Sequence, residues 1–324
     1  MRLRLLLLFS FILLIETVTC QPNNTDAGII KKDIQFYSNG LLLKGWLLLP
    51  SDTSNKKLPA IVMAPGFSGV KECNYQMIAG NFAKAGFAAL VFDYPNFGES
   101  EGRVRQEADP LLQVEAYRDA ISYVAAQKNI DSKRVGVWGG SYSGGHAIMV
   151  SALSNNVKCF VAMTPFVSGS LLLSRFPAAN KQFLQQQFLN DRTGRAEGKQ
   201  AAMIPVVSNQ KGEFAAVGSI NAWNFVESFK TYAPNFKNIV TLKSLEMQLA
   251  YEPGSYITKT ANMPKLFLIA KNDELIPEAD ILSFYEKASE PKELAYIDGH
   301  HFSPYMEKLT EACNVAIAFF KKYL

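Results

Sequence analysis

The sequence predicts an α/β protein in which helices cover both faces of a mostly parallel β-sheet. Short, almost continuous apolar runs alternate with longer segments whose apolar residues recur at helical spacing. Parallel strands that are buried on both faces produce such runs, and the connections between them leave room for a helix. In addition, motifs of glycine, serine and carboxylate residues directly follow several runs. The functional groups should therefore gather where strands end.

Composition excludes several classes of protein. The chain has 324 residues, of which 48% are hydrophobic and 19% are charged, so it is not disordered, collagen-like or a disulfide-dense miniprotein. Its 33 basic and 29 acidic residues give a formal charge of +4 without a basic run, and we expect no nucleic-acid partner. The length fits one elaborated α/β domain or two smaller domains.

Residues 1–20 are typical of a secretory signal peptide. Arg2 and Arg4 precede an apolar stretch, and Glu16 interrupts it before it is long enough to span a bilayer comfortably. We predict cleavage near residues 19–21, an exported (secreted or periplasmic) protein, and no transmembrane span in the mature chain.

Several alternatives concern single residues near and beyond the cleavage site. A lipid anchor on Cys20 is less favoured, because the residues before it match poorly the small-residue site that should precede it. Asn23 is a glycosylation acceptor if the host is a eukaryote. Without Cys20, the chain keeps Cys73, Cys159 and Cys313, whose spacing fits no metal site. We expect these three cysteines to be small buried apolar residues, at least one of them a free thiol.

Residues 21–164 are predicted to form the N-terminal part of the core. A strand at 41–49 follows the turn at 38–40, and the alternation of strands and helices then begins. Further strands are expected at 60–64, 88–92, 134–138 and 157–163, and helices at 78–85, 111–126 and 142–153.

The alternation stops at 165–264, which we interpret as a mostly helical insertion that forms a lid over the sheet. A compact second domain is the alternative. The insertion carries an apolar cluster of Trp223, Phe225 and Phe229. Residues 265–324 form the C-terminal part of the core. Its strands are expected at 265–270 and 294–297, and its helices at 278–287 and 308–322.

The strongest functional motif follows the apolar run at 134–138. Gly139 and Ser143 each lie two residues from Ser141, at the point where a strand passes into a helix. This pattern is typical of a nucleophile elbow, a strained turn that lifts a serine hydroxyl off the sheet and requires small neighbours. Ser143 is the alternative nucleophile, but Ser141 is favoured because it comes directly after the strand.

A serine hydroxyl needs a general base at neutral pH, and the chain has three histidines. His300 and His301 follow the last predicted strand, where the chain order serine, acid, histidine places the base. We favour His301, next to Phe302, over His300. His146 would lie about one turn into the helix after Ser141, on the wrong side to reach the hydroxyl, and should serve packing or surface polarity.

The acid should lie between the serine and the histidine in the sequence. Asp273 is favoured because it lies three residues past the strand at 265–270, and Glu274 is the alternative. A purely structural interpretation makes Asp273 a cap of the helix that begins near Pro277.

An oxyanion hole requires two backbone N–H donors. One should be Tyr142, directly after the favoured serine. The other should come from the tight loop after the strand at 60–64, where Phe67 is favoured over Ser68. An ordinary turn between strand and helix is the structural alternative for this loop.

These motifs, taken in order, resemble the landmarks of the α/β-hydrolase superfamily over nearly all of the mature sequence. The segments that carry the resemblance are 64–67, 93–100, 139–145, 272–277 and 299–305. Within the superfamily, 141–146 and 301–305 are similar to the branch with dienelactone-hydrolase-like and X-Pro-dipeptidyl-peptidase-like enzymes, to which fungal polyketide-releasing hydrolases also belong.

The resemblance implies an α/β-hydrolase fold with a mostly parallel eight-stranded sheet. The roles that it implies are nucleophile, acid, base and two oxyanion donors for, in that order, Ser141, Asp273, His301, Phe67 and Tyr142. Two features depart from the usual pattern, since Ser143 replaces a glycine and residues 64–65 lack the common histidine. Both departures concern the oxyanion hole more than the triad.

The sequence thus predicts an exported serine hydrolase that cleaves carboxylic esters through an acyl-enzyme, without a metal or organic cofactor. Apolar residues of the insertion suggest a small-molecule ester or acyl substrate with a hydrophobic part. A thioesterase, an acyltransferase or an X-Pro-type aminopeptidase would use the same triad. A catalytically inactive binding protein on the same scaffold is the second alternative, because a fold fixes a mechanism better than a substrate.

Overall fold

A computed structural model describes residues 28–52, 57–210 and 212–324. The predictions of the signal peptide, the lipid anchor at Cys20 and the glycan at Asn23 lie outside these residues and stay predictions. Within the described part of the chain, no helix combines the length and the apolar character that a membrane span requires.

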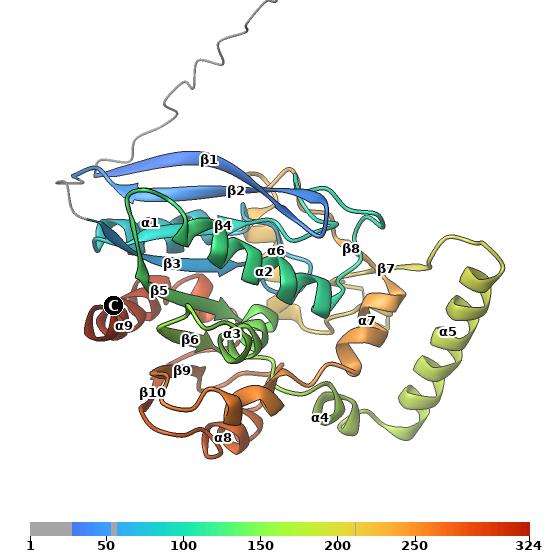
Figure 1. The fold of residues 1–324 in the computed structure, drawn as a ribbon. Helices are drawn as coiled ribbons and strands as arrows, with labels where there is room; N and C mark the ends of the chain where they lie inside the picture. The colour runs from blue at the N-terminus through green and yellow to red at the C-terminus, as the bar shows by residue number, and fades with distance from the viewer. Residues whose placement is uncertain (1–27, 53–56, 211) are drawn as a thin grey trace, which may run out of the picture.

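A sheet of eight strands runs through the centre of the molecule, as Figure 1 shows, in the order β1-β2-β4-β3-β5-β6-β9-β10. β2 pairs antiparallel with β1 and β4, and all other neighbours in this sheet are parallel. The mostly parallel eight-stranded sheet is thereby confirmed. The strands are β1 (Ile29–Ser38), β2 (Leu41–Pro50), β3 (Leu58–Ala64), β4 (Ala88–Phe92), β5 (Ile130–Gly140), β6 (Cys159–Met163), β9 (Lys265–Ala270) and β10 (Lys292–Ile297).

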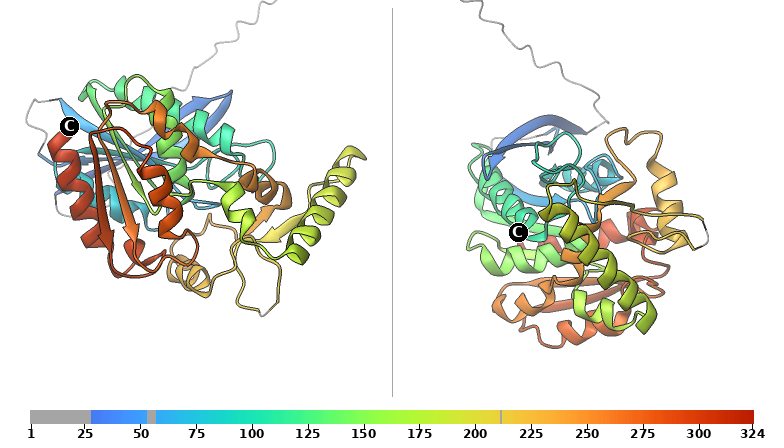
Figure 2. Two further views of the ribbon diagram at one scale, coloured as in Figure 1. Left: turned by 90° about the horizontal axis from the view of Figure 1, so that it is seen from below. Right: turned by 90° about the vertical axis from the view of Figure 1, so that its right-hand side faces the viewer.

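Helices pack on both faces of the sheet, as predicted (Figures 1 and 2). Helices α1 and α9 contact each other on one face, and α2, α3 and α8 lie on the other. Their bounds are α1 (Tyr75–Lys84), α2 (Pro110–Ala125), α3 (Tyr142–Leu153), α8 (Glu278–Tyr285) and α9 (Leu309–Tyr323). The side chains between these layers form one continuous apolar core, in which Cys73, Cys159 and Cys313 are buried free thiols, as expected.

Two strands of the central sheet differ most from the sequence-based expectation, and the short strands at 203–205 and 239–241 were not expected either. β1 was not expected, because only some of its side chains at the edge of the sheet are buried and the strand includes the charged residues Lys31, Lys32 and Asp33. β5 begins at Ile130 rather than at residue 134, since its first residues are polar although they already pair in the sheet. In both cases hydrogen bonding to a neighbouring strand outweighs a weak apolar pattern.

The segment between β6 and β9 consists mainly of helices beside the carboxyl ends of the strands, of which α5 is the longest. In Figures 1 and 2, α5 extends away from the body of the molecule. The elements are α4 (Gly169–Ser174), α5 (Ala178–Ala196), the antiparallel pair β7 (Met203–Pro205) and β8 (Ile239–Thr241), α6 (Ile220–Phe229), α7 (Leu242–Leu249) and the 3-10 helix η1 (Pro253–Lys259).

A buried ion pair ties the loop after β3 to the end of β4. The Lys71 ammonium lies 2.7 Å from Oδ2 of Asp93, and their side chains are 1% and 0% exposed. The backbone N–H of Lys71 donates to Asp93 Oδ1 at 2.7 Å, and that of Glu99 donates to Oδ2 at 3.0 Å. Because this loop also carries Phe67, the ion pair fixes the backbone beside the end of β5.

We expect Lys71→Met to lower the free energy of unfolding by about 3–5 kcal/mol, because it leaves the Asp93 carboxylate buried without its cation. Denaturant titration measures this loss. Lys31→Met is the matched control. The ammonium groups of Lys71 and Lys31 both lie over the ring of Trp46, but Lys31 is only half-buried. It should cost less than about 1 kcal/mol. Equal losses in the two variants would contradict the role of the buried pair.

Candidate active site

Ser141 occupies a strained turn between β5 and α3. Its φ of 56° and ψ of −123° are unfavourable for a residue with a side chain. Neighbouring backbone holds the turn in place, because the Ser141 N–H donates to the Met163 carbonyl at 2.8 Å and its carbonyl accepts from Phe166 N–H at 2.9 Å. The hydroxyl thus leaves the sheet at the end of β5, where the sequence placed it.

Small residues around the turn are required by close backbone approaches. A β-carbon at Gly139 would clash with the carbonyl oxygen of Ser143, and one at Gly145 with that of Phe166. The Ser143 side chain is fully buried, and its hydroxyl lies 3.1 Å from that of Tyr94. Ser143, the alternative nucleophile, therefore lies in the packed interior behind the turn.

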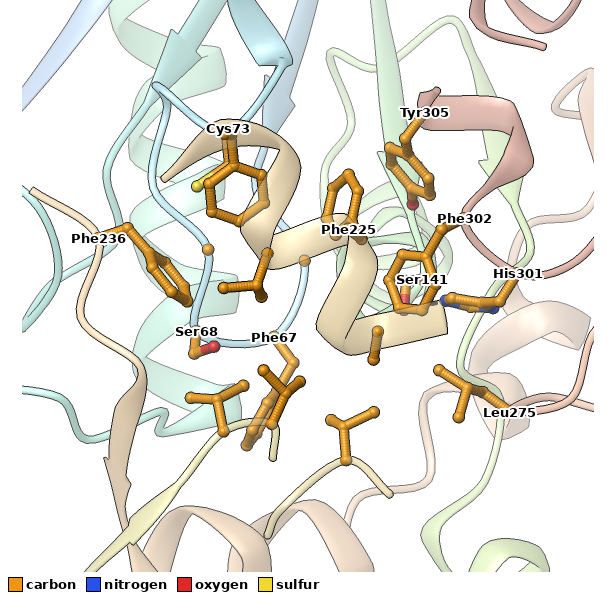
Figure 3. Close-up of a pocket in the computed structure, with 18 of the residues that line it drawn as sticks. Phe67, Ser68, Cys73, Ser141, Phe225, Phe236, Leu275, His301, Phe302 and Tyr305 are labelled. Carbon is orange, nitrogen blue, oxygen red and sulfur yellow. Dashed lines mark hydrogen bonds between the residues drawn. The ribbon is translucent and has the colours of Figure 1, made fainter. Parts of the chain in front are cut away.

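Three side chains form a continuous hydrogen-bonded chain at this edge of the sheet. His301 Nε2 lies 2.9 Å from the Ser141 hydroxyl, and His301 Nδ1 lies 2.6 Å from Asp273 Oδ2. The imidazole and the carboxylate are 1% and 0% exposed. In Figure 3 the imidazole of His301 points toward Ser141. The structure thus brings together the serine, histidine and aspartate that the sequence singled out.

Backbone donors fix the second oxygen of the aspartate. Asp273 Oδ1 accepts hydrogen bonds from the N–H groups of Leu275 and Ile276 at 2.9 and 2.8 Å. The purely structural interpretation of Asp273 is wrong, because α8 begins after Pro277 without a side-chain cap, and Oδ1 instead binds the backbone of the preceding turn. The other oxygen faces the imidazole, so one carboxylate holds both the loop and His301.

Glu274, the alternative acid, contacts the backbone of His301 and not its imidazole. Glu274 Oε2 accepts the N–H of His301 at 3.3 Å, whereas Oε1 accepts from the Ser219 hydroxyl at 2.8 Å and from Asn221 Nδ2 at 3.1 Å. Burial raises the pKa of this carboxyl, but these hydrogen bonds outweigh it and the net pKa is lowered. Glu274 therefore joins the start of α6 to the loop that carries the imidazole. His300 turns away, with Nδ1 accepting the N–H of Phe302 at 3.2 Å.

The loop after β3 lies against the serine turn. A β-carbon at Gly66 would stand 3.6 Å from the Ser141 β-carbon, and the rings of Phe67 and Tyr142 pack edge to face at 5.4 Å. Within the described residues, the backbone N–H groups of Phe67 and Tyr142 donate to no protein acceptor. Both donors flank Ser141 and are free to bind an oxygen there.

Ser141 lies where two cavities meet. The first holds about 620 Å³ of empty space, including its opening to solvent, and aromatic and aliphatic side chains form most of its wall. Figure 3 shows Phe225, on α6, beside Ser141 and His301 in this cavity. The second holds about 1550 Å³ and extends under α4, α5 and α7. Phe67, Ser141, Val217 and Leu275 line both, whereas Ser68, the alternative oxyanion donor, lines only the first.

The third histidine is buried and serves packing rather than surface polarity. His146 has no exposed surface, and its Nδ1 and Nε2 lie 2.8 Å from the Tyr251 hydroxyl and 3.0 Å from Gln113 Oε1. Since an amide oxygen only accepts, Nε2 carries the proton. Burial lowers the pKa of His146 to about 3, so its imidazole stays neutral.

Comparisons with known proteins agree with this fold. The sequence profile of the "alpha/beta hydrolase fold" family matches residues 59–307. Within the described residues, no cluster of three or more histidine, cysteine, aspartate or glutamate side chains is arranged to hold a metal ion. The sheet, the serine turn and the hydrogen-bonded imidazole define an α/β hydrolase. The chain belongs to the α/β-hydrolase family, which supports hydrolase activity.

Two curated relatives and one solved structure illustrate the similarity. Thiohydrolase aneE of Aspergillus aculeatus is 31% identical over 277 residues, which cover 83% of this chain and 86% of the relative. The quorum-quenching protein AidA of Acinetobacter baumannii is 30% identical over 269 residues, which cover 83% and 87%. The α/β hydrolase GrgF of Penicillium sp. sh18 has a TM-score of 0.77 at 22% identity, covering 90% of this chain and 98% of GrgF. That last likeness shows the fold alone.

The lowered pKa of His146 makes the fold less stable in acid. Between pH 6.5 and 3 the unfolded chain binds a proton on this imidazole that the folded chain does not. The neutral imidazole of His146 therefore costs the folded chain no stability above about pH 6.5, and the free energy of unfolding falls as the pH drops from there toward 3. From pH 7 to pH 5 the free energy of unfolding should drop by about 2 kcal/mol more in the wild type than in His146→Gln. Denaturant titration at both pH values measures the difference, and parallel losses in the two proteins would contradict it.

Proposed function

We propose that the protein is an exported serine hydrolase that cleaves carboxylic esters of small molecules with a hydrophobic part. The observation that carries this proposal is the hydrogen-bonded chain from Asp273 through His301 to Ser141, at the junction of two largely apolar cavities. The serine lies on a turn whose strain has no evident structural use except to present the hydroxyl. Export rests on the sequence of residues 1–20.

In this mechanism Ser141 Oγ attacks the ester carbonyl while His301 Nε2 accepts its proton. Asp273 keeps the other imidazole proton on Nδ1 and stabilises the cation that forms. The backbone N–H groups of Phe67 and Tyr142 hold the oxyanion. The imidazolium of His301 then protonates the leaving oxygen, and a water molecule, activated by the same imidazole, releases the acid from the serine.

A thioesterase is the second candidate, since aneE is named a thiohydrolase. The same three side chains would cleave a thioester by the same steps, with a thiol as the leaving group. Turnover of octanoyl p-nitrophenyl ester and of the octanoyl thioester of N-acetylcysteamine, measured on one preparation, separates the two activities.

The nucleophile is tested with a fluorophosphonate probe and a p-nitrophenyl ester. The wild-type protein should be labelled on Ser141, and Ser141→Ala should lose both the label and at least about 10⁴-fold in kcat. Ser143→Ala is the matched control and should keep the label, because that hydroxyl is buried behind the turn. An unlabelled wild type, or equal labelling of Ser141→Ala, would reject the proposal.

The base is tested by comparing the two adjacent histidines. His301→Ala should lower kcat/KM for the ester at least about 10⁴-fold, because no other described imidazole reaches Ser141. His300→Ala should keep kcat/KM within about tenfold of the wild type, since that ring hydrogen-bonds to the Phe302 backbone. The opposite result would move the base by one residue.

A further inference from the structure

The two cavities beside Ser141 differ in their relation to the imidazole. His301 lines the first cavity but not the second, whereas Ser141 lines both. In the proposed function the imidazole protonates the leaving oxygen, so that oxygen must lie within hydrogen-bond distance of Nε2 as it departs. The leaving alcohol therefore occupies the first cavity, and the acyl group extends into the second, larger one.

The first cavity offers a ligand few polar groups. Among the described residues that line it, none is an aspartate, a glutamate, a lysine or an arginine. Apart from Ser141 and His301, its polar side chains are each only 1–3% exposed, and they belong to Ser68, Cys73, Tyr75 and Tyr305. A group that enters this cavity therefore meets hardly any polar surface beyond the serine and the imidazole.

Four phenylalanine rings keep accessible surface in the same cavity. They are only partly buried, and they come from the loop after β3, from α6, from the segment after α6 and from the loop after β10, as Phe67, Phe225, Phe236 and Phe302. Figure 3 shows Phe225 and Phe302 near Ser141 and His301, and Phe236 farther along the cavity. A leaving group on the His301 side of the serine thus contacts Phe225 and Phe302 first.

The ring of Phe225 is held in position by its neighbours. It stacks on the ring of Phe302 at 4.8 Å and meets the ring of Phe229 edge to face at 5.0 Å. The start of α6, which carries Phe225, is tied to the loop of the acid, because Glu274 Oε1 accepts from the Ser219 hydroxyl at 2.8 Å. An aromatic wall that is fixed before the ligand arrives lowers the entropic cost of binding.

Such a wall selects the leaving group by two physical effects. A ring in the cavity makes the offset or edge-to-face contacts that aromatic pairs prefer, in addition to the gain from removing apolar surface from water. A sugar, a glycerol or an ether chain would lose its bound water and find almost no polar surface to replace it. The cavity therefore favours an apolar ring over a polar alcohol of similar size.

We propose that the first cavity binds an apolar, ring-containing alcohol, so that the substrates are esters of aryl-alkyl alcohols, and that Phe225 determines this specificity. The inference rests on the proposed function for the direction of the ester. It assigns separate parts of the substrate to the two cavities, and it makes α6 the element that selects the alcohol.

The test compares benzyl octanoate with methoxyethoxyethyl octanoate, whose acyl groups are identical and whose alcohols are both primary. Each kcat/KM is divided by the rate at which the same ester is hydrolysed by alkali. The wild-type value should be at least about tenfold higher for the benzyl ester, because its ring is removed from water on binding. Phe225→Leu keeps an apolar side chain but removes the ring, and it should lower this ratio by about 2- to 12-fold, the value of one aromatic pair.

Phe183→Leu is the matched control. This phenylalanine lines only the second cavity, and its side chain is exposed on α5. The substitution should keep the ratio between the two alcohols and change the ratio between benzyl octanoate and benzyl acetate, because it alters the acyl side. Phe225→Leu should leave that acyl ratio unchanged.

A wild-type enzyme without a preference for the benzyl ester would overturn the inference, and this comparison needs no variant. A Phe225→Leu protein that keeps the alcohol ratio would do the same, as would a Phe183→Leu protein that changes it. A failed inference is distinguished from a failed hydrolase. In the first case both octanoate esters are hydrolysed without preference and the fluorophosphonate probe still labels Ser141, whereas in the second neither occurs.

Discussion

The hydrogen bond between Asp273 and His301 is the contact on which the rest of the site depends. At 2.6 Å, and with both groups buried, it fixes the imidazole so that its other nitrogen faces the Ser141 hydroxyl. The carboxylate can do so because two backbone N–H groups hold its second oxygen. The turn after β9 thus fixes the carboxylate of Asp273, the carboxylate orients the imidazole of His301, and the imidazole faces the Ser141 hydroxyl at the end of β5. No step in this chain relies on an exposed side chain.

A second constraint acts on the opposite side of the serine. The loop after β3 must keep Phe67 beside Ser141, and its far end is held by the buried Lys71–Asp93 pair. Removing such a pair from water costs free energy that its mutual attraction barely offsets. The pair is therefore better explained by the loop position that it fixes than by a gain in stability.

Sequence patterns predicted the parts of the site that are local. The turn at Ser141, the carboxylate at Asp273 and the imidazole at His301 each lie within four residues of the end of a strand, so a short motif reveals them. The strand β1 was not predicted, because edge strands expose one face and lack an apolar run. The lining of the second cavity was not predicted for a different reason: Gln248, for example, is an ordinary glutamine in a segment without strand alternation, and only the folded chain brings it to the cavity. Long-range placement of this kind leaves no periodic signal.

This division between local and distant signals has a physical basis. The proposed reacting groups follow strand ends, where the sheet fixes their spacing, whereas one fold of this kind can host many substrates. The wall of the second cavity comes largely from the segment between β6 and β9, which includes Gln248 on α7. The same segment supplies only part of the wall of the first cavity, including Phe225 on α6. Because that segment contributes no strand to the central sheet, most of its sequence can change without moving the strand ends. Ser219 and Asn221 are exceptions, since they bind Glu274 beside the imidazole. Substrate choice in this protein should therefore be decided in α4 to α7, and the chemistry in the sheet.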